Sequence, residues 1–225
     1  MLIVGGVDIG NRKDISSRMI ETILDADVIV AENLEMFNGL CTSLSLSPKA
    51  KLIEYYAPMH ESKEMAILYK LTEYLDSNKK VLIVTDDGMP GVADPGGRII
   101  QMAHSLKHKV TVVPGPSIVS TLPAVLGLDS RRFTFEDELP SGQSERIAML
   151  QKLKAEGRGF LFIVKNRRDE NTKFYEVLDD ISLVFSPETP IGVGLNLTMP
   201  NEKIILSSVS DIMKRLGDYV ITQKD

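Results

Sequence analysis

Short apolar runs alternate with longer amphipathic stretches in the first half of the chain. The apolar runs predict strands at residues 2–4, 28–31, 52–55, 81–84 and 110–113. Amphipathic stretches predict helices at residues 61–75 and 97–106, and Asp14 is expected to cap an earlier helix that carries Ile15, Met19 and Ile23. Strands that alternate with helices predict a mostly parallel sheet with right-handed crossovers.

The second half of the chain predicts a more mixed α/β unit. Residues 117–128 form an apolar helical stretch with a proline at position 123. Further helices are predicted at residues 144–155, 172–178 and 209–216, and further strands at residues 133–136, 160–164, 191–197, 203–206 and 219–222. The sequence thus predicts two α/β domains, residues 1–115 and 116–225, of which the second has more hairpin character.

Composition narrows the class of protein. With 225 residues, 43% hydrophobic and 25% charged, the chain is typical of a soluble globular protein. A net charge of −5 excludes a basic field over the whole surface but leaves room for a local basic patch. Cys41 is the one cysteine, so no internal disulfide forms, which fits a reducing cytoplasm. No metal site and no membrane span are expected, because metal-ligand spacings and long apolar runs are missing from the sequence.

Three glycine-bearing loops follow predicted strands, at residues 5–11, 86–91 and 114–118. In open α/β sheets, ligands settle outside the carboxyl ends of parallel strands. Glycine lets backbone approach a ligand closely, and N–H groups at a helix start favour carboxylates and phosphates. The first loop lacks the G-x-G-x-x-G spacing of a dinucleotide site. Each loop alone fits a plain turn, but three on one sheet predict a small-molecule site.

The sequence of these loops resembles that of the tetrapyrrole methylase superfamily. The matching phrases keep the family's order and lie at residues 9–15, 26–32, 60–61, 86–96, 113–117 and 132–140. This resemblance implies two α/β domains with a cofactor cleft between them, and S-adenosylmethionine as the methyl donor. Within the superfamily, the phrases are most similar to those of the small-subunit ribosomal RNA methyltransferases, and the C-terminal extension of many members is not expected here.

The sequence departs from the family pattern more in the phrases associated with the substrate than in the cofactor loops. Val7-Asp8 stands where the family usually has Thr-Pro, and residues 32–35 read Glu-Asn-Leu-Glu in place of Glu-Asp-Thr-Arg. Residues 164–168 and 195–199 also depart from the family's second-domain phrases. The resemblance therefore implies the cofactor more firmly than it implies an RNA acceptor.

The resemblance also implies roles for individual residues. The expected cofactor-binding residues are Ile9, Gly10, Asp86, Gly88, Met89, Pro90, Gly115, Ser117 and Ile118. Physical chemistry agrees, because an acidic side chain suits the ammonium or the ribose diol of S-adenosylmethionine, and a helix start suits its carboxylate. Asp86 as a simple turn cap is the alternative.

Methyl transfer from a sulfonium requires mainly alignment of donor and acceptor. A hydroxyl acceptor also benefits from a base, for which Glu32 and His60 are the candidates. Glu32 as a surface acid and His60 as the start of a helix are the alternatives.

Basic residues are in excess between positions 146 and 173, where Lys165, Arg167 and Arg168 follow a predicted strand. Such a cluster suits RNA phosphates, although a solvated basic face is the alternative.

The leading hypothesis is a homodimeric enzyme that methylates ribose 2′-hydroxyls of small-subunit ribosomal RNA. A methyltransferase for a small acceptor such as a tetrapyrrole, or a catalytically degenerate S-adenosylmethionine-binding protein, are the other two hypotheses.

Overall fold

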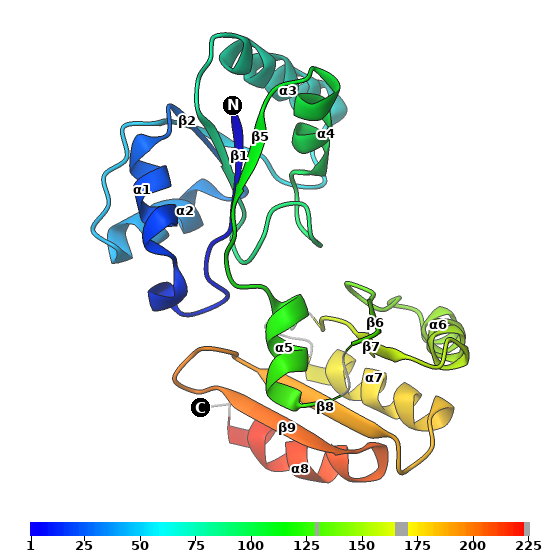
Figure 1. The fold of residues 1–225 in the computed structure, drawn as a ribbon. Coiled ribbons are helices and arrows are strands. Elements are labelled where there is room, and N and C mark those ends of the chain that lie inside the picture. The colour runs from blue at the N-terminus through cyan, green and yellow to red at the C-terminus, as the bar shows by residue number, and fades with distance from the viewer. Residues whose placement is uncertain (129–130, 165–170, 223–225) are drawn as a thin grey trace. The chain divides into compact units, whose positions relative to one another are not determined.

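The computed structural model describes residues 1–128, 131–164 and 171–222 (Figure 1). The chain divides into two compact units, the first formed by Met1–Ile118 and the second by the described residues that follow Ile118. Each unit has its own hydrophobic core.

The first unit is built on a parallel sheet of five strands within residues 1–118, all of which the structure describes. The strands are β1 (Leu2–Gly5), β2 (Val28–Ala31), β3 (Lys51–Glu54), β4 (Val81–Val84) and β5 (Val110–Val113). Their order is β3-β2-β4-β1-β5, and every neighbouring pair is parallel. The predicted parallel sheet is therefore confirmed.

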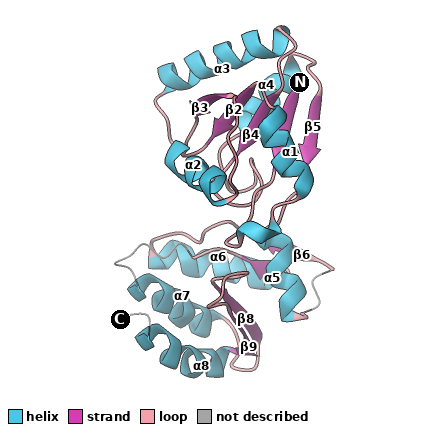
Figure 2. Cartoon of the chain, turned by 90° about the vertical axis from the view of Figure 1, so that its left-hand side faces the viewer, coloured by secondary structure: helices cyan, strands magenta, loops and turns pink. Residues whose placement is uncertain are grey.

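Helices cover both faces of this sheet (Figures 1 and 2). On one face, α1 (Ser17–Asp25) and α2 (Leu34–Ser43) bury Met19, Ile23 and Phe37 against the sheet. On the other face, α3 (Glu61–Asp76) and α4 (Gly97–Ser105) bury Leu71 and Ile99. Because successive strand residues point to opposite faces and both faces are covered, the strands read as unbroken apolar runs.

Two local predictions in this unit need correction. The helix α2 was not predicted from the sequence. Its N-cap is Asn33, whose side chain accepts the N–H groups of Glu35 and Met36 at 2.8 and 3.1 Å. The expectation that Asp14 caps α1 is wrong, because Asp14 ends a 3-10 turn, η1 (Arg12–Asp14), and Ser16 caps α1. The Ser16 hydroxyl accepts the third N–H of that helix at 3.1 Å, as an N-cap serine commonly does.

The second unit combines two small sheets with four helices among its described residues. A parallel pair joins β6 (Phe133–Phe135) to β7 (Gly159–Leu161), and a hairpin joins β8 (Pro190–Leu195) to β9 (Lys203–Ser208). The helices are α5 (Ile118–Leu126), α6 (Gln143–Ala155), α7 (Asn171–Val184) and α8 (Val209–Thr222). Leu150, Ile181 and Ile212 lie at the centre of its core.

The strand predicted at residues 219–222 is wrong, because α8 continues to Thr222. Tyr219, Val220 and Ile221 have the composition of a strand, which favoured that prediction. The buried residues Val209, Ile212 and Leu216 recur at helical spacing, and this apolar stripe packs α8 on the core. Packing of an amphipathic face thus outweighs local strand preference.

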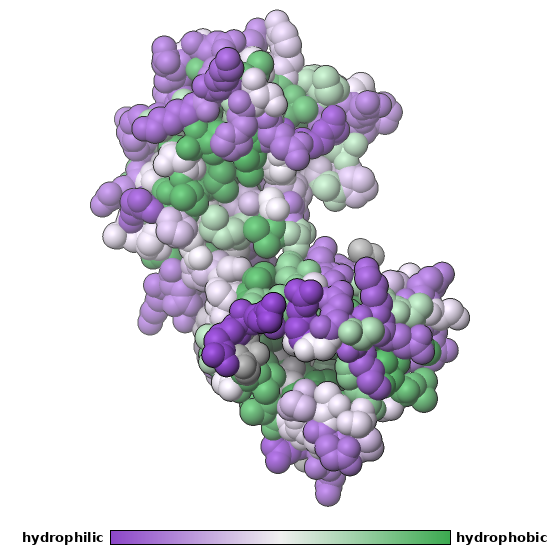
Figure 3. Space-filling view, turned by 45° about the vertical axis from the view of Figure 1, so that its right-hand side comes forward, coloured by the Kyte–Doolittle hydropathy of each residue, from purple (hydrophilic) through white to green (hydrophobic). Residues whose placement is uncertain are grey.

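Hydrophilic residues cover much of the surface in Figure 3, with smaller apolar areas between them. Among the residues that the structure describes, no helix is long and apolar enough to cross a membrane.

Candidate active site at the carboxyl edge of the parallel sheet

Three loops leave the carboxyl ends of β4, β1 and β5, which are neighbours in the sheet. Loop 1 comprises residues 6–11 after β1, loop 2 comprises residues 85–96 after β4, and loop 3 comprises residues 114–117 after β5. Because all these strands are parallel, the three loops meet at one edge, as the sequence predicts.

Backbone hydrogen bonds hold the three loops together. The Gly6 N–H donates to the Val113 carbonyl at 2.9 Å, which joins loop 1 to the end of β5. Val7 N–H donates to the Gly88 carbonyl at 2.9 Å, and Gly88 N–H donates to the Asp8 carbonyl at 3.0 Å. This reciprocal pair fixes loop 1 against loop 2.

Glycine is required where loops 1 and 3 touch. A Cβ on Gly115 would lie 2.6 Å from the carbonyl carbon of Gly6, and a Cβ on Gly6 would lie 2.5 Å from the Gly115 nitrogen. Real Cβ atoms do not approach backbone so closely, so any side chain would force the loops apart.

All three loops converge at Gly88. Its φ of +65° lies in the left-handed region that favours glycine. A Cβ built there would lie 3.8 Å from Ile9 of loop 1 and 3.8 Å from the Pro116 carbonyl oxygen of loop 3. The half-buried side chains of Ile9 and Met89 stand beside this point.

Four carboxylates gather at the same edge. Asp8 is fully buried and pairs with Arg12 at 2.7 Å, while its other oxygen accepts the Gly10 N–H at 3.0 Å. Glu32, directly after β2, accepts the Asp86 N–H at 3.3 Å. Asp86 and Asp87 follow β4 on loop 2.

Burial and mutual repulsion raise the pKa of two of these acids. Desolvation, then the charges of Glu32 and Asp87, raise the pKa of Asp86 to about 6. Desolvation and the charge of Asp8 also raise the pKa of Asp87, which Arg12 partly offsets. The edge is therefore strongly acidic, and a bound cation would reduce the repulsion between its carboxylates.

Sequence reasoning missed Asp8, Arg12 and Asp87. Asp8 counted only as a departure from the family pattern, although a buried acid requires a partner. The spacing of four residues between Asp8 and Arg12 is not a signal for their ion pair, because that spacing brings side chains together within a helix and Asp8 lies in loop 1.

The hydrogen bonds of His60 are local and lie at the start of α3, not in the acidic cluster. It is the exposed N-cap residue of α3, and its Nδ1 lies 2.8 Å from the Ser62 hydroxyl and 3.4 Å from the Ser62 nitrogen. The structure thus gives His60 a capping role, and its catalytic role stays a prediction.

A second polar group links β3 to the two helices that follow. The buried hydroxyl of Tyr55 donates to Glu64 on α3 at 2.5 Å, and Glu64 also pairs with Arg98 on α4. Burial and the neighbouring Glu64 raise the pKa of Tyr55. Because α4 begins directly after loop 2, this group ties the end of that loop to α3.

Comparison with known proteins identifies the family. The family model for "Tetrapyrrole (Corrin/Porphyrin) Methylases" matches residues 1–213. The chain belongs to the tetrapyrrole methylase family. It is therefore a methyltransferase, and methyltransferases of this family use S-adenosylmethionine.

Several relatives cover nearly all of this tetrapyrrole methylase. "Ribosomal RNA small subunit methyltransferase I" of Thermotoga maritima is 32% identical over 226 aligned positions, covering 98% of this chain and 96% of the relative. The protein of the same name from Mycobacterium tuberculosis is 26% identical, covering 94% of this chain and 71% of the relative.

Solved structures support the fold. A cobalt precorrin-4 methyltransferase, CbiF, has a TM-score of 0.63 at 19% identity and covers 98% of this chain and 90% of its own. A diphthine synthase has a TM-score of 0.65 at 18% identity and covers 95% of this chain and 83% of its own. At such low identity the likeness shows the fold alone, which matches the predicted α/β fold class.

The basic segment of this tetrapyrrole methylase proves partly structural. Arg146 is buried and pairs with the fully buried Asp180 at 2.6 Å. Lys154 donates to the Val184 carbonyl at 2.6 Å, at the end of α7. These two cations are therefore engaged within the second unit, while Lys165, Arg167 and Arg168 lie outside the described residues.

Proposed function

We propose that this methyltransferase binds S-adenosylmethionine on the three loops at the carboxyl edge of the parallel sheet. We also propose that it methylates a ribose 2′-hydroxyl of small-subunit ribosomal RNA. The convergence of the loops on Gly88 beside an acidic cluster carries the cofactor part. Relatives named as ribosomal RNA methyltransferases support the acceptor.

The residues at this edge fit S-adenosylmethionine. The closely packed glycines let a ligand reach backbone groups of all three loops. Asp86 suits the ammonium group or the ribose diol, and half-buried Ile9, Met89 and Ile118 suit the adenine and the thioether chain.

Further cofactor contacts come from the neighbours of these residues. Ser117 directly precedes α5, and the N–H groups at the start of a helix suit the carboxylate of the ligand. Gly10, Pro90 and Gly115 lie in the same three loops and contribute backbone surface.

The charge of the ligand also suits the cluster. S-adenosylmethionine carries an ammonium and a methyl-bearing sulfonium, which supplies the methyl group when the cofactor is bound. A cation near Asp86 and Asp87 favours their charged forms, which offsets the desolvation and the repulsion that raise the pKa of each carboxyl.

Glu32 is the proposed base for a ribose hydroxyl. Its carboxylate contacts the backbone of Asp86, so it stands directly beside the proposed cofactor residue. A ribose hydroxyl is a weak acid, and a positioned carboxylate that accepts its proton would assist transfer. His60 remains the second proposed base.

The proposed RNA acceptor rests on the similarity of this chain to relatives named as ribosomal RNA methyltransferases. Lys165, Arg167 and Arg168 are proposed to contact RNA phosphates. A tetrapyrrole acceptor is the second candidate, since the matching family model is named for corrin and porphyrin methylases. A homodimer is proposed from the family resemblance, and a cytoplasmic location is proposed from the single cysteine.

Methyl transfer from tritiated S-adenosylmethionine tests this function. The substrate would be small ribosomal subunits that lack the modification, and alkaline hydrolysis of the RNA would locate a 2′-O-methyl group by its resistance to cleavage. We expect label in the RNA with the wild type and a strong loss with Asp86→Ala. A folded, cofactor-binding wild type that labels a porphyrin but no RNA would favour the second candidate.

A further inference from the structure

An open groove of about 680 Å³ lies on the second unit, and none of its lining residues belongs to the loops that are proposed to bind the cofactor. Its lining comes from two segments, the residues before β6 and the turn between α6 and β7. The lining residues are Arg131, Arg132, Glu156, Gly157, Arg158 and Gly159. Three arginines and one glutamate give this groove a positive balance on a chain whose net charge is −5.

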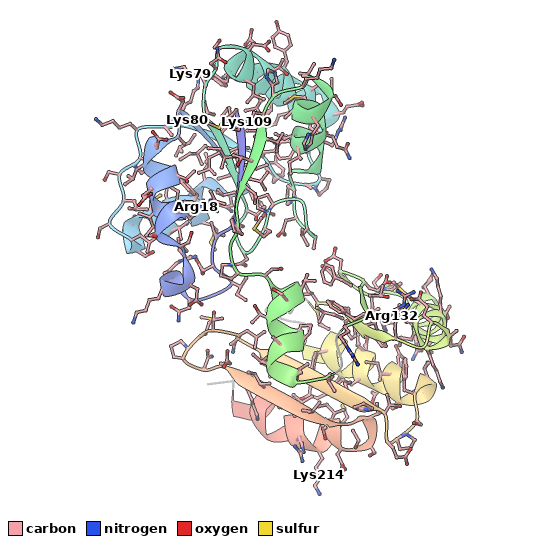
Figure 4. All side chains as sticks on the ribbon, in the orientation of Figure 1. Arg18, Lys79, Lys80, Lys109, Arg132 and Lys214 are labelled. Carbon is pink, nitrogen blue, oxygen red and sulfur yellow. The ribbon has the colours of Figure 1, made fainter. Side chains whose placement is uncertain are left out.

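The sheet register brings two of these arginines together. Phe133 of β6 lies beside Gly159 of β7 in parallel register. The residues that precede them, Arg132 and Arg158, therefore emerge side by side at the amino ends of neighbouring strands, about 4.8 Å apart along the sheet. Figure 4 labels Arg132 at this position.

Glu156 neutralises only part of this charge. Its carboxylate forms an ion pair with Arg158 Nε at 3.2 Å and accepts a hydrogen bond from the Thr134 hydroxyl at 3.3 Å. Among the described residues, no carboxylate pairs with Arg132. The groove thus presents a guanidinium available to a ligand beside a second one that is held in place by Glu156.

We propose that this groove binds the phosphodiester backbone of the RNA substrate. A guanidinium presents a planar fork of N–H donors that matches two phosphate oxygens. A local basic groove also gives an acidic protein the attraction that a polyanion requires. This inference rests on the proposed function, because it assigns a substrate contact in the second unit to an RNA methyltransferase.

RNA fits the groove better than a polycarboxylate small molecule does. The groove is open, and its walls are guanidinium and glycine rather than the apolar and aromatic side chains that enclose small ligands. Backbone phosphates are recognised on such open, charged surfaces without a closed pocket.

Binding of a fluorescein-labelled single-stranded RNA, copied from the small-subunit ribosomal RNA, tests the proposal by anisotropy. Arg132→Ala and Arg158→Ala should each weaken binding about tenfold, as expected for loss of a charge-assisted contact. The slope of log affinity against log salt should fall by about 0.7 for each lost phosphate contact. Glu156→Gln removes the counter-charge and should strengthen binding a few-fold. Lys214→Ala, at an exposed lysine on α8, is the matched control and should bind as the wild type does.

Titration of each variant with S-adenosylhomocysteine separates this inference from the proposed function. Cofactor binding should be unchanged in the groove variants, since they lie outside the three loops. If the wild type methylates RNA and all groove variants bind RNA as tightly as the wild type does, the inference is overturned and the proposed function stands. If the groove variants lose binding to uroporphyrin but keep their binding to RNA, the groove binds a small acceptor and the inference is overturned. A wild type that neither binds nor methylates RNA would remove the proposed function itself.

Discussion

Replacing Asp86 with asparagine removes one carboxylate from the acidic cluster while keeping the size of the side chain. The pKa of Asp86 rises from its ordinary value of 3.8 to about 6 in the folded chain. At 1.36 kcal/mol for each unit, this shift corresponds to about 3 kcal/mol that the charged form costs the folded state. Asp86 is partly exposed, so solvent screening reduces our expectation to about 1–2 kcal/mol.

The sign of the pH dependence follows from the raised pKa. Because the folded state holds the proton more tightly than the unfolded state, this residue lowers stability as pH rises from about 4 to about 6. Below pH 3.8 the carboxyl is protonated in both states and costs nothing. Asparagine cannot ionise, so Asp86→Asn should stabilise the protein without ligand by about 1–2 kcal/mol at neutral pH and above.

Urea unfolding without cofactor at about pH 8 and at about pH 4 measures this effect. The gain of Asp86→Asn over the wild type should be present at the higher pH and should vanish at the lower one. The control is Asp14→Asn, at an exposed carboxylate outside the cluster. An equal gain at both pH values, or a less stable variant at the higher pH, would show that desolvation and repulsion in the cluster do not destabilise the charged form of Asp86.

Two further predictions concern packing. Gly115→Ala should cost about 1–3 kcal/mol and weaken cofactor binding, because its Cβ would meet Gly6 backbone, whereas Gly39→Ala inside α2, with open space around it, should be neutral or stabilising by up to about 1 kcal/mol. Urea unfolding of both variants checks the contrast, and equal effects would contradict it. Arg146→Ala leaves Asp180 buried without its ion-pair partner and should cost about 3–5 kcal/mol, whereas Lys152→Ala on the exposed face of α6 should change stability little. A loss below about 1 kcal/mol for Arg146→Ala would mean that Asp180 takes up a proton or another partner.

The parallel sheet could be predicted from sequence because its strands are buried on both faces. Such strands read as unbroken apolar runs, as residues 81–84 do, and their ends are marked by acid, glycine and proline. The same marks located the three loops, since a parallel sheet puts the ends of β1, β4 and β5 at one edge.

Features that depend on tertiary contacts could not be predicted in this way. The ion pair of Asp8 with Arg12 depends on burial that one sequence does not reveal. The helix α2 contains Asn38 and Gly39, which weaken its local signal, and it forms because Phe37 and Leu40 pack on the sheet. The charge of Arg146 looked available to RNA, although it is used inside the second unit.

Calorimetric titration with S-adenosylhomocysteine tests the central claim most directly. The three loops and their acidic cluster should bind this ligand in the wild type. Asp86→Ala should weaken binding by about tenfold or more, the loss expected for a hydrogen bond to a charged group, and Asp14→Ala should leave it unchanged. A wild type without detectable binding, or equal affinity in all three proteins, would contradict a cofactor site at the carboxyl edge of this sheet.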